Sequence, residues 1–408
     1  MKTKAHSLRE LGHRLDDAVE RMEDRIREIR RYLHAHPEPS GEEFQTTSYL
    51  ANLLDDAGLD YRIPATGRGL FVDSLSPGGG RRCALRADID ALRLHDAKEV
   101  TYRSLKKELM HACGHDAHTA MLAGAVLALR AVETEIPHVL PAWRAIFQPA
   151  EESATGALEM MAHGALDEVD SIFALHVDPT IPAGKIGYRH GTLTATCVEF
   201  EITLSGKGGH GARPHLTADP IAAAAQLIQT LYAHLPRSLD AQSPNVLSIG
   251  MIRGGINPNV IPDEVRIGGT IRTIESDMDA IVRARMENIL RGLEMQTGVA
   301  YRIAQPFRLE GVRNDLETTT RCLRAAREVF STDGLIALER PSMGGEDFAH
   351  YLREVPGCMM RLGVAFAEGP PRHLHSSHFD VDERALAFGA KMLARAVLEL
   401  PSASDSVS

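Results

Sequence analysis

The sequence has few of the features that mark membrane, secreted or nucleic-acid-binding proteins. Its 408 residues contain no apolar run long enough to span a bilayer, which argues against a membrane partner. The formal net charge of −10 leaves no basic excess for a phosphate backbone, so we expect no nucleic-acid partner. Residues 1–20 are charged and lack the hydrophobic core of a signal peptide. Aromatic residues are only 5% of the chain, which disfavours a large aromatic-lined pocket.

Cysteine is also scarce. Five cysteines at scattered positions make an odd number and form no recognisable disulfide framework. Together with the absent signal peptide, this favours reduced thiols and a cytoplasmic location. What is present is a globular composition, with 44% hydrophobic and 25% charged residues. A chain of this length exceeds one ordinary core, so we expect two domains.

The first half of the chain alternates short strands with helices. Apolar residues at spacings of three and four predict one long helix from Ser7 to His34, which ends near Pro37. Beyond it, the predicted elements are helices at 42–54, 117–130 and 155–163 and strands at 69–72, 82–86, 142–147 and 171–176, with a turn at 76–80. This order is typical of an α/β domain with a mostly parallel sheet flanked by helices.

The pattern changes near Gly191. The segment to about Tyr301 predicts the order β-α-β-β-α-β of a ferredoxin-like α+β fold. We therefore expect a catalytic domain at 1–190 and 305–400 that is interrupted by a lid and dimerisation domain at 191–304. Residues 401–408 are polar, and we expect a disordered tail there. The last part of the catalytic domain is predicted to hold helices at 315–331 and 383–399 and strands at 334–338 and 358–363.

The stretch His111–His118 concentrates three imidazoles, a thiol and a carboxylate. Within it, Gly114 separates Cys113 from His115 and allows the backbone to turn so that sulfur and imidazole converge. A thiolate with a neutral imidazole suits zinc or another borderline divalent metal. Taken alone, the stretch is equally well explained as a helix-capping loop with a buried thiol and surface histidines.

Chemically active residues follow several of the predicted strands. These groups are Asp88 and Asp90, Cys113 and His115, Glu151 and Glu152, His176, and a late cluster at 373–378 with three histidines. Strand ends of a parallel sheet share one edge, so these groups are expected to meet in one cleft. A centre with two divalent metals needs about five or six ligands, one of them shared. Of the adjacent glutamates, one can ligate while the other acts as a general base.

The sequence resembles the metal-dependent aminoacylase and carboxypeptidase superfamily, in its amidohydrolase branch with hippurate hydrolase, N-acyl-L-amino-acid amidohydrolases, N-acetyl-diaminopimelate deacetylase and indole-acetyl-amino-acid hydrolases. The matching blocks cover nearly the whole chain. They are LHAHPE at 33–38, ALRADIDAL at 84–92, MHACGHDAHT at 110–119, FQPAEE at 147–152, GKGGHGARPH at 206–215, NVIPD at 259–263 and GTIRT at 269–273.

The resemblance implies two divalent ions per subunit (Zn, Mn, Co or Ni). Cys113 would bridge them, His115 and His176 would complete one site, and Glu152 and His375 the other. His375 is preferred to His378 because the family pattern is Leu-His-Ser.

The resemblance also implies roles outside the ligand set. Glu151 would be the general base and Asp90 would orient an imidazole. His210, often supplied by the neighbouring subunit, would stabilise the oxyanion. Asn259 and Arg272 would grip the substrate carboxylate.

The sequence therefore predicts a dinuclear metallo-amidohydrolase that cleaves the amide of an N-acyl amino acid and forms a homodimer or a dimer of dimers. One alternative keeps the site but acts on a dipeptide or a C-terminal residue. A second is a catalytically silent metal-binding homologue, which the intact Glu151 disfavours. A third, a thiol redox protein built on Cys113, is disfavoured because no resolving cysteine lies near it in sequence.

Overall fold

The computed structural model describes residues 7–75 and 82–399. Its contacts divide the chain into two compact units. The first unit takes the residues up to Leu193, Arg313–Arg340 and the residues from Glu346 onward, and the second takes Thr194–Val312 and Pro341–Gly345. The domain limits from the sequence stay a prediction, and the expected turn at 76–80 and tail at 401–408 lie outside the described residues.

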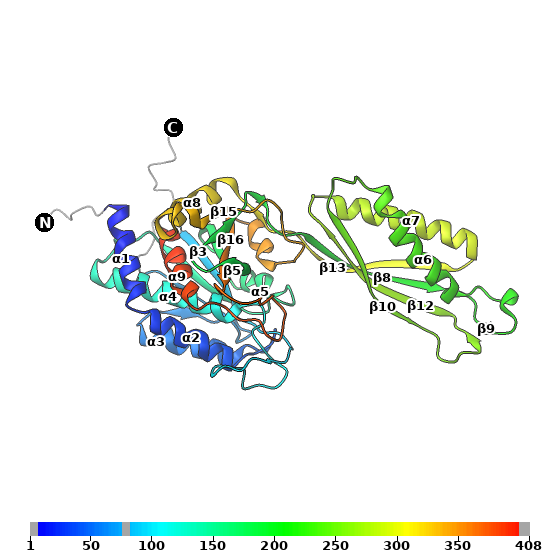
Figure 1. Cartoon of the computed structure of the whole chain (residues 1–408), viewed down its shortest axis with the longest axis horizontal. Helices are drawn as coiled ribbons and strands as arrows, with labels where there is room; N and C mark the ends of the chain where they lie inside the picture. Colours follow the sequence, from blue (N-terminus) through cyan, green and yellow to red (C-terminus); the bar gives the residue numbers. More distant parts are fainter. Residues whose placement is uncertain (1–6, 76–81, 400–408) are drawn as a thin grey trace. The chain divides into compact units, whose positions relative to one another are not determined.

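The first unit contains an eight-stranded, mostly parallel sheet (Figure 1). In spatial order its strands are β1 (Tyr61–Arg62), β2 (Leu70–Asp73), β4 (Trp143–Gln148), β3 (Arg82–Asp88), β5 (Val169–Pro182), β16 (Gly357–Ala365), β6 (Ile186–Tyr188) and β15 (Leu335–Ala337). The central pairs β4–β3, β3–β5 and β5–β16 are parallel. Every residue of β4 is buried, as expected for a strand covered on both faces.

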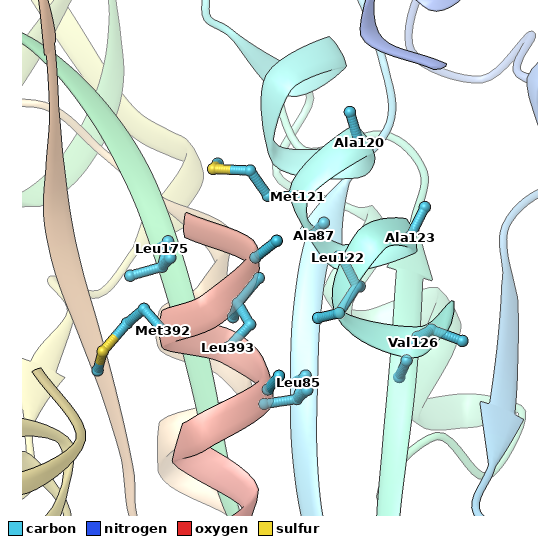
Figure 2. Packing of buried hydrophobic residues seen from close by; sticks show 14 of the residues in the cluster. Leu85, Ala87, Ala120, Met121, Leu122, Ala123, Val126, Leu175, Met392 and Leu393 are labelled. Atoms are coloured by element: carbon cyan, nitrogen blue, oxygen red, sulfur yellow. The ribbon is translucent and has the colours of Figure 1, made fainter. Parts of the chain in front are cut away.

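Helices α1 (Leu8–Glu20), α2 (Glu23–Ala35), α4 (His115–Glu135) and α9 (Arg384–Ala396) pack against one another on this sheet. Figure 2 shows Leu122 of α4 and Leu393 of α9 beside Leu85 of β3, and Met121 of α4 next to α9. Gly389 allows the two helices to approach closely, because a β-carbon there would overlap the Met121 sulfur. The remaining helices of this unit are α3 (Phe44–Asp56), α5 (Gly156–Ala162) and α8 (Leu316–Val329).

Two expectations about single elements were wrong. The predicted helix from Ser7 to His34 is two helices, α1 and α2, which meet at Arg21 and Met22. The apolar spacing continues unchanged across the break, so periodicity gave no signal of it. The predicted strand 171–176 is also longer, because β5 continues to Pro182 in register with β16.

His176 therefore does not lie at the end of a strand. The pairing of β3 with β5 stops at Ala174, whereas β16 stays paired with β5 beyond that point. At His176 the side of β5 that β3 occupied is instead next to Gly114 and helix α4. His176 is accessible from that side because of the register of the sheet and not because the strand ends there.

The second unit contains an antiparallel sheet with the spatial order β10–β12–β8–β13. Its main elements in chain order are β8 (Thr196–Ser205), α6 (Pro220–His234), β10 (Asn245–Gly254), β12 (Glu264–Thr273), α7 (Met278–Thr297) and β13 (Ala300–Leu309). This is the predicted β-α-β-β-α-β order, so the expected fold class is confirmed for both parts. A separate two-stranded ribbon joins β9 (Gly209–His210) to β11 (Val260–Ile261). Among the described helices, none is long and apolar enough to cross a bilayer.

Candidate metal centre

The turn before α4 brings Cys113 and His115 close together. Gly114 lies between them with φ of +88°, which a residue with a side chain adopts only at a cost. A β-carbon at Gly114 would also collide with Val177 of β5, so only glycine fits. The backbone N–H of His375 donates to the Ala112 carbonyl at 2.8 Å and fastens the late histidine loop to this turn.

Three donors form the first candidate metal-binding group. Donor atoms of Cys113, His115 and His176 all lie within 4.8 Å of one another, and Cys113 Sγ is 3.6 Å from His176 Nε2. His115 Nδ1 lies 3.0 Å from a carboxylate oxygen of Asp90, and His176 Nδ1 lies 2.8 Å from the Val177 carbonyl. Each Nδ1 therefore carries the proton, and each Nε2 lone pair is free to ligate.

The second candidate group shares Cys113 with the first. Donor atoms of Cys113, Glu152 and His375 lie within 4.8 Å of one another, and His375 Nε2 is 3.4 Å from Glu152 Oε1. The Glu152 backbone N–H donates to Asp90 Oδ2 at 3.0 Å. Asp90 therefore contacts residues of both groups, one through a side chain and one through the backbone.

The donor atoms that lack hydrogen-bond partners fit a divalent metal. Among the described residues, His115 Nε2 and Glu152 Oε1 are buried and have no hydrogen-bond partner. Leaving such groups unpaired is costly, so a ligand at this point is expected. Burial raises the pKa of the Cys113 thiol to about 12. Burial and, to a smaller extent, the positive charge of Arg361 lower the pKa of His176 well below its usual range. A neutral imidazole and a thiol that must lose its proton to a metal suit zinc, cobalt, nickel or manganese better than calcium or magnesium.

Glu151 lies beside both groups, since donor atoms of Glu151, His115 and Glu152 lie within 4.8 Å of one another. Its Oε2 is 3.8 Å from His115 Nε2, and its Oε1 is 3.4 Å from the Asp347 backbone nitrogen. Burial raises the pKa of the Glu151 carboxyl well above its usual range, Glu346 and Asp347 raise it further, and His115 opposes them. A carboxyl with a raised pKa is better able to accept and return a proton.

A buried ionic cluster stabilises the start of α4. Asp116 accepts from Arg30 Nε at 2.8 Å, and its Oδ2 lies 2.7 Å from His34 Nδ1. Arg30 also donates to Asp380 at 2.8 Å, close to the late histidine loop. Burial opposes ionisation of Asp116, but Arg30 and His34 hold the pKa of its carboxyl far below the usual range. The LHAHPE motif therefore supports the metal loop through His34.

Residues predicted for substrate binding belong to the second unit. His210 pairs with Val260 in the ribbon. Asn259, the residue before Val260, lies next to this pair, and its carbonyl accepts from the Gly211 N–H at 2.9 Å. His210 Nδ1 accepts from the Ala212 backbone nitrogen at 3.1 Å. The proton of a neutral His210 is therefore on Nε2, which is exposed and can donate to a substrate.

Arg272 lies at the opposite end of β12 from the ribbon. Its guanidinium donates to the Met343 carbonyl at 2.7 Å. The strand from Glu264 to Arg272 corresponds to about 26 Å at 3.3 Å per residue. The predicted pair Asn259 and Arg272 is therefore not brought together within one chain, whereas His210 and Asn259 are.

Some residues near the site were given no role by the sequence. Glu346 and Asp347 follow the glycines of the 344–348 loop and lie close enough to Glu151 to form a three-carboxylate group. Arg86 donates to Asp347 at 2.8 Å and to Asp88 at 2.6 Å. The only sequence signal was an acidic pair after two glycines, and its distance in sequence from Glu151 hid the contact.

The α/β sheet and the two donor groups around one cysteine define a metal-dependent hydrolase. Comparison with known proteins agrees. Residues 84–399 match the model of Peptidase family M20/M25/M40. The chain belongs to this family, which confirms the resemblance found in the sequence. It is a metal-dependent hydrolase of amide bonds.

Relatives cover nearly the full chain. The N-acetyl-L-cysteine deacetylase of Bacillus subtilis is 36% identical over 90% of this chain and 85% of its own. The IAA-amino acid hydrolase ILR1-like 4 of Arabidopsis thaliana is 34% identical over 92% of this chain and 86% of its own. Among solved structures, the Bacillus subtilis YXEP protein, a dinuclear metal-binding peptidase of family M20, has a TM-score of 0.80 and 31% identity and covers 93% of this chain and 98% of its own.

Proposed function

We propose that the protein hydrolyses the amide bond of N-acyl amino acids and releases a carboxylic acid and the free amino acid. The observation that carries this proposal is the position of Cys113 in both donor groups, with Glu151 directly beside them. The names of the deacetylase and the IAA-amino acid hydrolase among the relatives support an N-acyl amino acid as the substrate class.

Two divalent ions would be held by this chain. His115 and His176 would bind one, Glu152 and His375 the other, and Cys113 both, as the two donor groups suggest. When bound, the ions supply Lewis acidity that polarises the substrate carbonyl and favours ionisation of the attacking water. The donor set suits Zn, Mn, Co or Ni. The dinuclear metal-binding peptidase among the solved relatives supports the count of two.

The protein's own side chains would move the protons. Glu151 would accept a proton from the attacking water and return it to the amide nitrogen as the amine leaves. Asp90 would keep the His115 ring in its ligating orientation through the 3.0 Å contact at Nδ1. His210 would donate from Nε2 to the oxygen on which negative charge develops.

The substrate carboxylate would be bound by Asn259 and Arg272, and guanidinium is well suited to a carboxylate. Because β12 separates these two residues in one chain, we propose that they reach one substrate from two subunits, in a homodimer or a dimer of dimers. His210 shares the ribbon with Asn259 and would come from the same subunit as it. We further propose a cytoplasmic location, which the odd number and scattered positions of the cysteines in the sequence support.

A peptidase is the second candidate function. It uses the same site and differs only in the acyl group, which would be an aminoacyl residue. The solved relative YXEP is named a peptidase, and a relative in Saccharolobus solfataricus, 34% identical, is named Thermostable carboxypeptidase 2.

A substrate panel tests the proposal. Protein stripped with a chelator and reloaded with Zn²⁺, Mn²⁺, Co²⁺ or Ni²⁺ should release free amino acid from acetyl, benzoyl or indole-acetyl conjugates. Faster release from dipeptides would favour the peptidase. No hydrolysis of any conjugate or dipeptide with any of the four ions would contradict both.

A further inference from the structure

His118 is buried on the first turn of α4 and belongs to neither donor group. Its ring packs on the His176 ring, with the centroids 4.8 Å apart and the planes at 62°. The backbone N–H of Val177, the residue after His176, donates to His118 Nε2 at 2.9 Å. His118 therefore contacts both the ring of a proposed ligand and the peptide that follows it.

These contacts fix the tautomer of His118. A backbone N–H can only donate, so Nε2 must be the acceptor and the proton must lie on Nδ1. Nδ1 lies 2.6 Å from Asp88 Oδ1, which accepts that proton. Asp88 is itself held by Arg86, whose Nη1 donates to Oδ2 at 2.6 Å. A chain of defined hydrogen bonds thus runs from Arg86 to the Val177 peptide, and every member is buried.

Val177 in turn sets the orientation of His176 through its carbonyl group. The Val177 carbonyl accepts from His176 Nδ1 at 2.8 Å, which directs His176 Nε2 towards Cys113 Sγ. The same residue is thus held at its nitrogen by His118 and at its oxygen by His176. At this point β5 has lost β3 as a neighbour, so the sheet does not pair with the Val177 N–H from that side.

We propose that His118 is a positioning residue for one metal ion. Its contact with Val177 orients His176, and its contact with Asp88 holds the His118 ring in place. This inference rests on the proposed metal centre and deepens it. His176 belongs only to the group of Cys113 and His115. Loss of His118 should therefore weaken the ion of that group and leave the ion of Glu152 and His375 bound.

Two substitutions separate the two halves of the His118 contact. In His118→Asn, the side-chain amide lies at about the position of the histidine Nδ1. The variant therefore keeps a donor to Asp88 and loses the acceptor for the Val177 N–H. The amide of His118→Gln reaches about the place of Nε2 and keeps the acceptor for Val177. His163→Asn is the matched control, because His163 is exposed at the end of α5 and its Nδ1 bonds only locally, to the Glu159 carbonyl.

The experiment is a competition of Co²⁺ between the metal-free protein and a chromophoric chelator, which gives two dissociation constants per subunit. For His118→Asn one constant should rise by roughly 10–100-fold, the scale found when such a supporting contact is lost, while the other stays within about threefold. His118→Gln should lie closer to the wild type, and His163→Asn should match it. In a His176→Ala background the effect of His118→Asn should vanish, whereas a general loss of stability would persist.

Several results would overturn the inference. These are unchanged constants in His118→Asn, equal weakening of both ions, or damage by His118→Gln as large as that by His118→Asn. If His118→Asn does not fold, Asp88→Asn decides. An amide accepts more weakly than a carboxylate and has a donor NH2 group in place of one oxygen, so the contact with His118 Nδ1 and, through it, the same single ion should be weakened. Unchanged constants in Asp88→Asn would then refute the proposal. Wild-type protein that binds fewer than two ions would overturn the metal centre itself, whereas two ions with unaffected variants would overturn only this inference.

Discussion

Replacing Glu151 with glutamine removes the proposed general base with little change of shape. The amide keeps an oxygen that can accept from the Asp347 backbone nitrogen, as Glu151 Oε1 does at 3.4 Å. It also removes a buried negative charge that faces Glu346 and Asp347, so the fold should not suffer. None of the proposed metal ligands is altered. The variant should therefore fold and bind two ions.

The expected loss is catalytic. A positioned general base contributes about 10²–10⁴-fold, and a glutamine can neither accept the proton from water nor return it to the leaving amine. The loss should fall towards the upper part of that range, because the substitution removes both the acceptance of the proton and its return. We expect kcat to fall by roughly three decades, which corresponds to about 4 kcal/mol of transition-state stabilisation.

The assay is steady-state hydrolysis of an N-acyl amino acid by metal-loaded wild type and Glu151→Gln, with bound metal measured by elemental analysis in the same samples. The reasoning predicts a low kcat, a KM that changes little, and equal metal content. Turnover within about tenfold of the wild type at full metal content would refute the role of Glu151. A variant that loses its metal would instead show that Glu151 ligates.

Three further predictions concern other parts of the first unit. Cys113→Ala should bind fewer than two ions per subunit by elemental analysis, and an unchanged stoichiometry would contradict its shared position. Gly114→Ala should destabilise the metal-free protein by roughly 1–2 kcal/mol through the left-handed backbone alone, seen as a lower thermal unfolding midpoint; an unchanged midpoint would show that the loop adapts. Burial raises the pKa of Glu43 from 4.5 to about 7, so its ionisation costs stability as the pH rises from about 4.5 to about 7. Between pH 5 and pH 8, the wild type should lose stability that Glu43→Gln keeps, so urea unfolding of the metal-free variant should become less favourable relative to wild type by up to about 3 kcal/mol; a difference independent of pH would contradict this.

The sequence predicted most of the fold because the local apolar pattern agrees with the observed helices and strands along most of the chain. Parallel strands are covered on both faces and appear as short apolar runs, and the donors that follow them share one edge of the sheet. The closeness of His115 to Glu151 and Glu152 could be anticipated in this way, whereas His176 lies within β5 and joins the donors through the register of the sheet. The ferredoxin-like order of the second unit could be anticipated as well, because each of its elements carries its own periodicity.

What the sequence could not give depends on contacts between distant segments. The length of β5 past His176 is set by its register with β16, nearly two hundred residues later in the chain. The tautomer of His118 depends on the Val177 peptide, and the pKa of Glu151 depends on Glu346 and Asp347. No local pattern encodes these partners, so only the three-dimensional arrangement reveals them.

The separation of Asn259 from Arg272 is a similar case. Both motifs are clear in the sequence, and both suit a carboxylate, yet the length of β12 keeps them apart in one chain. The spacing of thirteen residues gave no hint, because the first few residues form the ribbon and the others run along the sheet. Only the strand register shows that the two residues lie far apart within one chain.

The most direct test of the central claim is the rate of N-acyl amino acid hydrolysis as metal is returned to chelator-stripped protein. We expect no turnover without metal and a rate that rises until two equivalents of ion are bound per subunit and then stays constant. Full turnover by the metal-free protein, or a rate that does not depend on the equivalents added, would contradict it.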